Sequence, residues 1–160
     1  MTQIDIQQYK GHRFMYLDDY LWMWDTPQER DLQNELADQT YGEVLVAGYG
    51  FGLLTERLLK NPDVRSVTTV EKYPEVIEKM RELSGQIYGD VIIKDFFDLN
   101  ENKKYDCIIG DIWPDIAAKF LKDYLEFKHK AEKLLKDGGS ILAWGKEFFD
   151  FLDRKKQLGS

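Results

Sequence analysis

Residues 44–59 constrain the fold most, because they join a short apolar run, a turn with glycine at alternate positions and an amphipathic segment. The apolar run ends at Ala47, and the glycines are Gly48, Gly50 and Gly52. Glycine lets a backbone turn sharply and lets a ligand approach it closely. A strand that enters a glycine-rich turn at a helix N-terminus is typical of nucleotide sites in doubly wound α/β folds. The segment therefore predicts an α/β fold with a nucleotide-type ligand.

The rest of the chain alternates between predicted strands and helices. Further strands are predicted at 66–70, 91–93, 105–109 and 140–144, and further helices at 74–83, 116–134 and 146–157. This alternation predicts a Rossmann-like parallel sheet of about five strands, in the order 3-2-1-4-5, with helices on both faces. We expect one domain over residues 1–158, divided into an N-terminal part (1–41), an α/β core (42–145) and a C-terminal helix (146–158).

The N-terminal part does not fit this alternation. Residues 13–17 and 20–24 are rich in aromatic side chains and flank Asp18-Asp19, which predicts a β-hairpin. Asp or Thr before a proline then predicts a helix over 29–39, with Leu32 and Leu36 near its buried edge. The hairpin aromatics either pack only against one another, or the hairpin folds over the glycine turn.

Acidic residues follow the predicted strands. In an open α/β sheet, ligands bind outside the carboxyl ends of the strands. These ends carry the glycine turn at 48–52, Glu71, Asp95 and Asp111. An acid at one strand end can simply be a solvated surface residue. Four strand ends that carry a glycine turn or an acid at the same edge of a sheet indicate a ligand site.

The spacing of the glycines separates two classes of nucleotide. A dinucleotide fingerprint reads G-x-G-x-x-G, whereas here the third glycine comes one position early, at Gly52, and Leu53 follows it. The G-x-G-x-G form resembles the first motif of class I S-adenosylmethionine-dependent methyltransferases, and the resemblance extends over about residues 43–145. It implies that S-adenosylmethionine is the cofactor. Cofactor contacts are then expected at Gly48, Tyr49, Gly50, Gly52, Glu71, Lys72, Asp95, Phe96 and Asp111.

Particular roles are expected for some of these residues. One carboxylate at Glu71, about 20 residues after the glycines, can accept hydrogen bonds from both hydroxyls of a ribose. The resemblance implies that Asp95 accepts from the exocyclic amine of adenine, with Phe96 or Phe97 against the ring. Tyr49 either packs or lines the methionine end of the ligand. The plainer alternative is that the two acids are surface residues.

Residues 111–114 occupy the place of the family's fourth motif, where the acceptor meets the methyl group. Asp111 is expected to be catalytic, orienting an amine or guanidine or accepting its proton. Trp24, Asp25, Trp113 and Pro114 are expected around the acceptor, where an aromatic face can hold a cation. Alternatively, Asp111 caps the next helix and Trp113 lies in the core.

Two shorter resemblances bear on the acceptor. Residues 24–27 are similar to a W-E-T-P segment of guanidinoacetate N-methyltransferase, and residues 14–18 to the N-terminal hairpin of spermidine synthases. The first resemblance, with Asp111 and Trp113, implies methyl transfer to a small amine- or guanidine-type acceptor. The alternatives are spermidine-synthase-like aminopropyl transfer and S-adenosylmethionine binding without catalysis.

The usual sixth and seventh strands of the family are absent from the predicted pattern. We therefore expect an acceptor pocket that is open, or completed by the N-terminal hairpin or by another subunit. The fifth strand would lie at a sheet edge, which favours a homodimer or coverage by residues 1–24.

Composition restricts the partners. The net charge is −7 and the only dense cationic run is at 154–156, which makes a nucleic-acid partner unexpected. The single cysteine, Cys107, is expected to be buried and inert, and it fits a reducing cytoplasm. No apolar segment approaches the roughly 20 residues of a membrane span, and no cluster of ligating residues suggests a metal. A cytoplasmic protein with a small-molecule acceptor and no membrane contact is expected.

Overall fold

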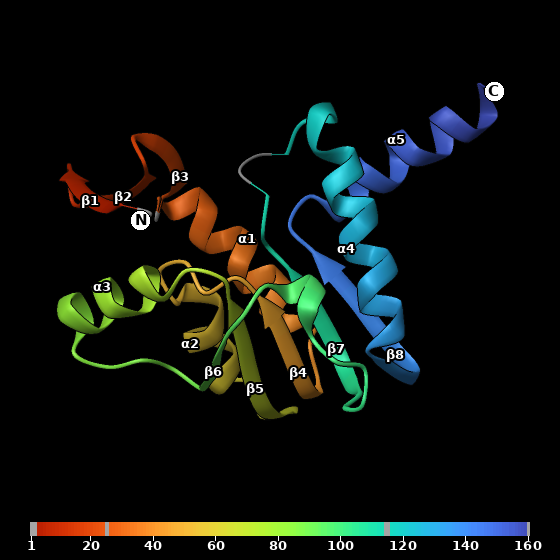
Figure 1. The fold of residues 1–160 in the computed structure, drawn as a ribbon, viewed down its shortest axis with the longest axis horizontal. Helices are drawn as coiled ribbons and strands as arrows, with labels where there is room; N and C mark the ends of the chain where they lie inside the picture. The colour runs from red at the N-terminus through yellow and green to blue at the C-terminus, as the bar shows by residue number, and fades with distance from the viewer. Residues whose placement is uncertain (1–2, 25, 114–115, 160) are drawn as a thin grey trace.

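The computed structural model describes residues 3–24, 26–113 and 116–159, and its strands form two sheets (Figure 1). The larger sheet is parallel, in the order β6-β5-β4-β7-β8. Its strands are β4 (Gly42–Ala47), β5 (Val64–Glu71), β6 (Asp90–Ile93), β7 (Tyr105–Gly110) and β8 (Leu135–Ala143). The predicted five strands and their order are confirmed, and the helix α5 follows β8.

Helices cover both faces of this sheet. They are α1 (Pro27–Asp38), α2 (Leu53–Leu59), α3 (Pro74–Ser84), α4 (Leu121–Lys133) and α5 (Lys146–Leu158), with 3-10 turns η1 (Phe96–Asp98) and η2 (Ala118–Phe120). Successive residues of β4 point to opposite faces. Val44 and Val46 pack with α1 and α2, whereas Leu45 and Ala47 pack with α4. The central strand is therefore buried on both faces, as a parallel sheet requires.

The N-terminal sheet has one strand more than predicted. It is antiparallel and consists of β1 (Ile4–Tyr9), β2 (His12–Leu17) and β3 (Tyr20–Trp24). The predicted hairpin is β2–β3, and its turn residues Asp18 and Asp19 have positive φ angles. Apolar side chains of β1 and β2 pack with the glycine turn and α3. The small sheet lies at the α3 end of the molecule and not along the edge strand β8 (Figure 1). It therefore does not provide the predicted coverage of that edge, and the alternative, a homodimer, stays a prediction.

Helix α1 begins and ends close to the predicted residues, but it faces the sheet differently. The Thr26 hydroxyl accepts a hydrogen bond from the Glu29 N–H at 3.5 Å and caps the helix. The buried residues are Gln33 and Ala37, whereas Leu32 is 41% exposed. The prediction that Leu32 marks the buried edge was wrong. The packing of α1 against α2 and β4 decides which side of the helix is buried, and this side carries a glutamine.

Two boundaries near the C-terminal half differ from the sequence prediction. Helix α4 begins at Leu121, after the turn η2, and not at residue 116. The last strand, predicted to begin at residue 140, begins at Leu135, so residues 137–139 are part of β8. A side chain at Gly139 would come within 2.7 Å of the Asp106 carbonyl oxygen. The glycine therefore permits close approach of β7 and β8, and the strand continues through it.

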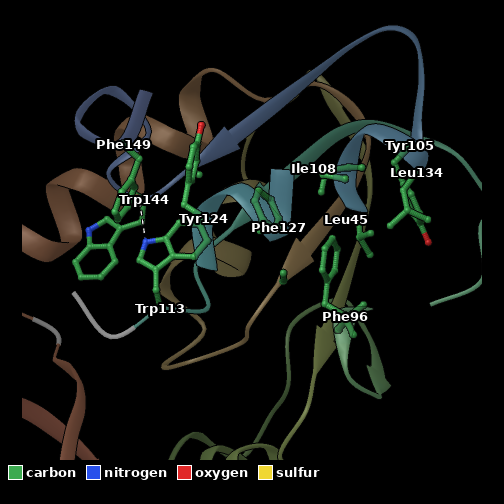
Figure 2. Close-up of a cluster of buried hydrophobic side chains, with 14 residues drawn as sticks. Leu45, Phe96, Tyr105, Ile108, Trp113, Tyr124, Phe127, Leu134, Trp144 and Phe149 are labelled. Atoms are coloured by element: carbon green, nitrogen blue, oxygen red, sulfur yellow. Dashed lines mark hydrogen bonds between the residues drawn. The ribbon is translucent and has the colours of Figure 1, made fainter. Parts of the chain in front are cut away.

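Aromatic side chains fill the core between the sheet, α4 and α5 (Figure 2). Tyr124 and Phe149 stack with their ring centroids 5.0 Å apart, and Trp113 meets Tyr124 edge-on at 5.7 Å. Cys107 of β7 is a free cysteine and fully buried, as predicted. Burial raises the pKa of the Cys107 thiol, which fits an inert packing role. Among the helices of the described ranges, none has both the length and the apolar character needed to cross a bilayer.

Candidate functional site

A cavity of about 220 Å³ lies at the carboxyl ends of the parallel strands. All four predicted strand ends contribute to it. The predicted residues that line it are Gly48, Gly50, Glu71, Lys72, Asp95, Phe96 and Asp111. Its walls also include Met15 and Met23 of the small sheet, Phe97, and Val70, Tyr73, Val76 and Ile112. The sequence therefore located the cavity, but it did not predict the two methionines.

The glycine turn is built for close backbone contacts. Gly48 has φ +95° and donates its N–H to the Val70 carbonyl at 2.9 Å. A side chain there would lie 2.7 Å from the Asp111 carbonyl oxygen, and one at Gly50 would collide with the Met23 sulfur. The first glycine thus lets the ends of β4 and β7 meet, and the second lets β3 close over the turn. Gly52 begins α2 and does not line the cavity.

The Glu71 carboxylate is held in place by backbone donors. Its Oε1 accepts from the Tyr49 N–H and its Oε2 from the Tyr73 N–H, both at 3.0 Å. The residue is only 7% exposed, and burial raises the pKa of its carboxyl while these hydrogen bonds oppose the rise. Each oxygen can accept a second hydrogen bond. The arrangement suits a ligand that presents two hydroxyls.

Asp95 and its aromatic neighbours form the opposite wall. Asp95 Oδ1 accepts from the Phe97 N–H at 3.0 Å, and Oδ2 lies 3.6 Å from the Lys72 Nζ. Phe96 is buried and packs on Phe127, with ring centroids 5.3 Å apart, whereas Phe97 is half-exposed. Both predicted rings line the cavity, and Phe97 offers more free surface to a ligand ring.

Tyr49 contributes mainly through its backbone. Its ring is buried among residues of α3 and the small sheet, and its hydroxyl accepts from the Tyr88 N–H at 3.1 Å. Burial raises the pKa of this phenol. Tyr49 also lines a smaller cavity of about 30 Å³, together with Glu29 and Asp111.

Asp111 is tied to helix α1. Its Oδ2 accepts from Gln33 Nε2 at 3.0 Å, and the same nitrogen donates to Glu29 Oε1 at 2.9 Å. Burial, and then the charge of Glu29, raise the pKa of Asp111 to about 7, while the Gln33 hydrogen bond opposes this. Burial also raises the pKa of Glu29. Asp111 therefore does not cap the following helix, which begins only at Leu121.

Tryptophans surround the Glu29–Asp111 pair. A cavity of about 20 Å³ is lined by both acids together with Met23, Trp24, Trp113 and Trp144. Trp24 meets Trp144 edge-on, with ring centroids 6.5 Å apart. Trp113 is 3% exposed, donates its indole N–H to the Trp144 carbonyl and packs in the core, so only one edge of it reaches the cavity. The predicted Asp25 and Pro114 lie outside the described residues.

Around Asp111, the sequence also did not predict Glu29, Gln33 and Trp144. Glu29 and Gln33 are one helical turn apart, in line with the buried Ala37. Such a row resembles the solvated face of an amphipathic helix until its orientation against the sheet is known. The sequence thus shows that Glu29 and Gln33 lie on the same face of the helix, but it does not show that this face points to the sheet. Within the described ranges, no group of His, Cys, Asp and Glu side chains is arranged to hold a metal ion.

Comparisons with known proteins support the fold. No family model and no curated protein matches the chain. Spermidine synthase from Thermotoga maritima superposes with a TM-score of 0.67 at 22% identity, covering 89% of this chain and 53% of that one. A spermidine synthase in complex with the transition-state analogue AdoDATO gives 0.66 at 21%, covering 89% and 52%.

A methyltransferase has the same fold as well. An S-adenosylmethionine-dependent methyltransferase from Clostridium acetobutylicum gives a TM-score of 0.51 at 21% identity, covering 74% of this chain and 50% of that one. This chain thus spans about half the length of each of these proteins. It has the class I methyltransferase-like fold that these structures share.

Proposed function

We propose that this protein binds S-adenosylmethionine in the cavity at Glu71 and transfers its methyl group to a small amine- or guanidine-type acceptor beside Asp111. The carrying observation is the Glu71 carboxylate, which two backbone N–H groups hold at the end of β5 with acceptor capacity left on both oxygens. The ribose would bind there. Asp95 and Phe97 would hold the adenine, and the glycine turn would pass the methionine part.

The acceptor would lie on the other side of the turn. There the walls are Glu29, Asp111 and Trp24, with no lysine or arginine among the described lining residues. Two carboxyls and aromatic faces favour a group that is cationic and rich in N–H donors. This supports an amine or a guanidine over a hydroxyl or a nucleic-acid base.

The proposed chemistry needs alignment and one proton acceptor. When bound, S-adenosylmethionine supplies an electrophilic methyl group on a sulfonium. Asp111 takes a proton from the acceptor nitrogen, which frees a lone pair on that nitrogen. The C–N bond then forms as the C–S bond breaks, and its electron pair goes to sulfur. A base with a pKa of about 7 suits this proton transfer at neutral pH.

Calorimetry with S-adenosylmethionine and S-adenosylhomocysteine tests the cofactor. We expect Glu71→Ala to weaken binding by about 1–3 kcal/mol, or roughly 5- to 150-fold, because ribose hydroxyls lose their acceptors. Glu71→Gln keeps one acceptor oxygen toward the backbone and should weaken binding less. Glu78→Ala, at an exposed acid on α3, is the matched control. Unchanged affinity in both Glu71 variants, or no binding by the wild type, would reject the proposal.

Aminopropyl transfer is a second candidate that one observation favours. The methionine side of the turn faces Glu29 and Asp111, and these acids would repel the carboxylate of S-adenosylmethionine. The decarboxylated cofactor lacks that carboxylate. Tighter binding of the decarboxylated form, with transfer to a diamine, would replace methyl transfer by this reaction. Tight binding without product on amine and guanidine panels would instead indicate a protein that only binds the cofactor.

A further inference from the structure

The Gln33 side chain connects two carboxyls from different elements. It lies on α1 at 5% exposure, and its Nε2 donates to Glu29 Oε1 at 2.9 Å and to Asp111 Oδ2 at 3.0 Å. A glutamine amide has only two N–H donors, so both are used. Its Oε1 is buried and has no partner among the described residues. Turning the amide over would point this oxygen at two carboxyls, so the observed orientation is fixed.

The two acids meet at the same amide nitrogen of Gln33. Glu29 is one turn before Gln33 on α1, and Asp111 follows β7. Their mutual repulsion makes the ionised pair costly, and the shared donor offsets part of that cost. The other ionisable side chains that line the cavities shared by Asp111, among the described residues, are Tyr49, Glu71, Lys72, Tyr73 and Asp95.

We propose that Gln33 is the positioning residue of the acceptor site, holding Asp111 ready to take the acceptor's proton while Glu29 stays ionised beside it. This inference rests on the proposed function, because it assumes that the acceptor lies at Asp111. In the step, an N–H bond of the bound amine breaks and an O–H bond forms on Asp111. The nitrogen keeps the electron pair, and the amide of Gln33 gives up no proton.

The arrangement makes two substitutions act in opposite directions on Asp111. Gln33→Met keeps the length of the side chain but removes the donor, so the ionised form of Asp111 is less stabilised and its titration midpoint should rise. Glu29→Gln keeps the shape but removes the neighbouring charge, so the midpoint should fall. If Gln33 and Glu29 only filled space, replacing either by a side chain of equal size would leave the titration midpoint of Asp111 unchanged.

The test is a carbon-13 NMR titration of the full chain labelled at the aspartate carboxyls, with Asp111→Asn assigning the resonance. We expect the Asp111 midpoint to rise by about one pH unit in Gln33→Met and to fall in Glu29→Gln. Gln28→Met, at an exposed glutamine of the same helix, is the matched control and should leave it unchanged. If Gln33→Met does not fold, Gln33→Glu replaces it, and the midpoint should again rise.

An Asp111 midpoint that stays within error of the wild type in the folded Gln33 variant would overturn the inference, as would a fall. Calorimetry keeps this outcome apart from failure of the proposed function. Because Gln33 lines the smaller cavity beside the glycine turn, cofactor binding is measured on the wild type and on Gln28→Met, which should bind S-adenosylmethionine equally. Absence of binding in the wild type would reject the cofactor proposal, whatever the titration gives.

Discussion

Replacing Asp111 by asparagine should stabilise the folded protein above neutral pH, because the ionised carboxylate is costly where it lies. Burial and the charge of Glu29 raise the pKa of Asp111 from 3.8 to about 7. A shift of about three pH units corresponds to about 4 kcal/mol of folding free energy. Asparagine has nearly the same shape and can accept the Gln33 hydrogen bond through its Oδ1. The substitution therefore removes the ionisation and leaves the contact.

The sign of the effect follows from proton linkage. The folded state holds the Asp111 proton more tightly than the unfolded chain does. The stability contributed by this proton is fully present below the unfolded pKa of about 4 and is lost as the pH rises through about 7. The asparagine variant has no such loss. Its free energy of unfolding, relative to wild type, should increase by up to about 4 kcal/mol between about pH 4 and pH 8 and then level off.

Urea unfolding at a series of pH values measures this difference, since the midpoint and slope give the free energy of unfolding at each pH. Asp98→Asn, at an exposed carboxyl near the turn η1, is the matched control and should show no such trend. A difference between Asp111→Asn and wild type that does not change with pH would refute the reasoning. So would a difference that decreases as the pH rises.

Two further substitutions test the turn and the core. Gly48→Ala should destabilise the fold by about 2 kcal/mol or more and abolish S-adenosylmethionine binding, because alanine is strained at φ +95° and its Cβ would lie 2.7 Å from the Asp111 carbonyl oxygen. Urea unfolding measures the stability and calorimetry the binding. A variant as stable as the wild type would contradict the prediction. Tyr124→Phe should lower stability by about 1 kcal/mol, because it removes the 2.6 Å hydrogen bond to Asp150 while the ring still stacks on Phe149. An unchanged thermal midpoint would mean that other donors satisfy Asp150.

The parallel sheet could be predicted because each of its strands carries a local signal. The apolar run before the glycine turn indicates β4, and the β-branched run before Glu71 indicates β5. Strand β1 lacks such a signal, since Ile4 and Ile6 are the only aliphatic residues in Ile4–Tyr9. It pairs with β2 in a local hairpin over the turn residues Lys10 and Gly11, both at positive φ, and the sequence analysis missed this turn. Its packing on α3 is tertiary, and an apolar pattern in the sequence does not supply it.

The two halves of the site differ in the same way. The part of the cavity around Glu71 and Asp95 was predictable because these residues follow strands whose order fixes where their ends meet. The surroundings of Asp111 depend on the rotation of α1 about its axis. A rotation by one residue would replace Gln33 with a neighbour and separate Glu29 from Asp111. Periodicity places a helix and its faces, but it does not say which face meets the sheet when the polar row is the buried one.

The neighbouring carboxyls of Glu29 and Asp111 lower the stability of the folded state, and folding alone gives no reason to keep them together. Two carboxyls that share one neutral donor lower the stability of the folded state at every pH where both are ionised. An amide at either position would relieve this with little change of shape. The folded state loses stability over the pH range in which Asp111 ionises, and in this same range Asp111 can accept a proton from an amine. Burial and the charge of Glu29 therefore lower the stability of the folded state and also raise the pKa of Asp111 to about 7, while the Gln33 hydrogen bond opposes the rise. Under the proposed function, this shift is what makes Asp111 a base near neutral pH.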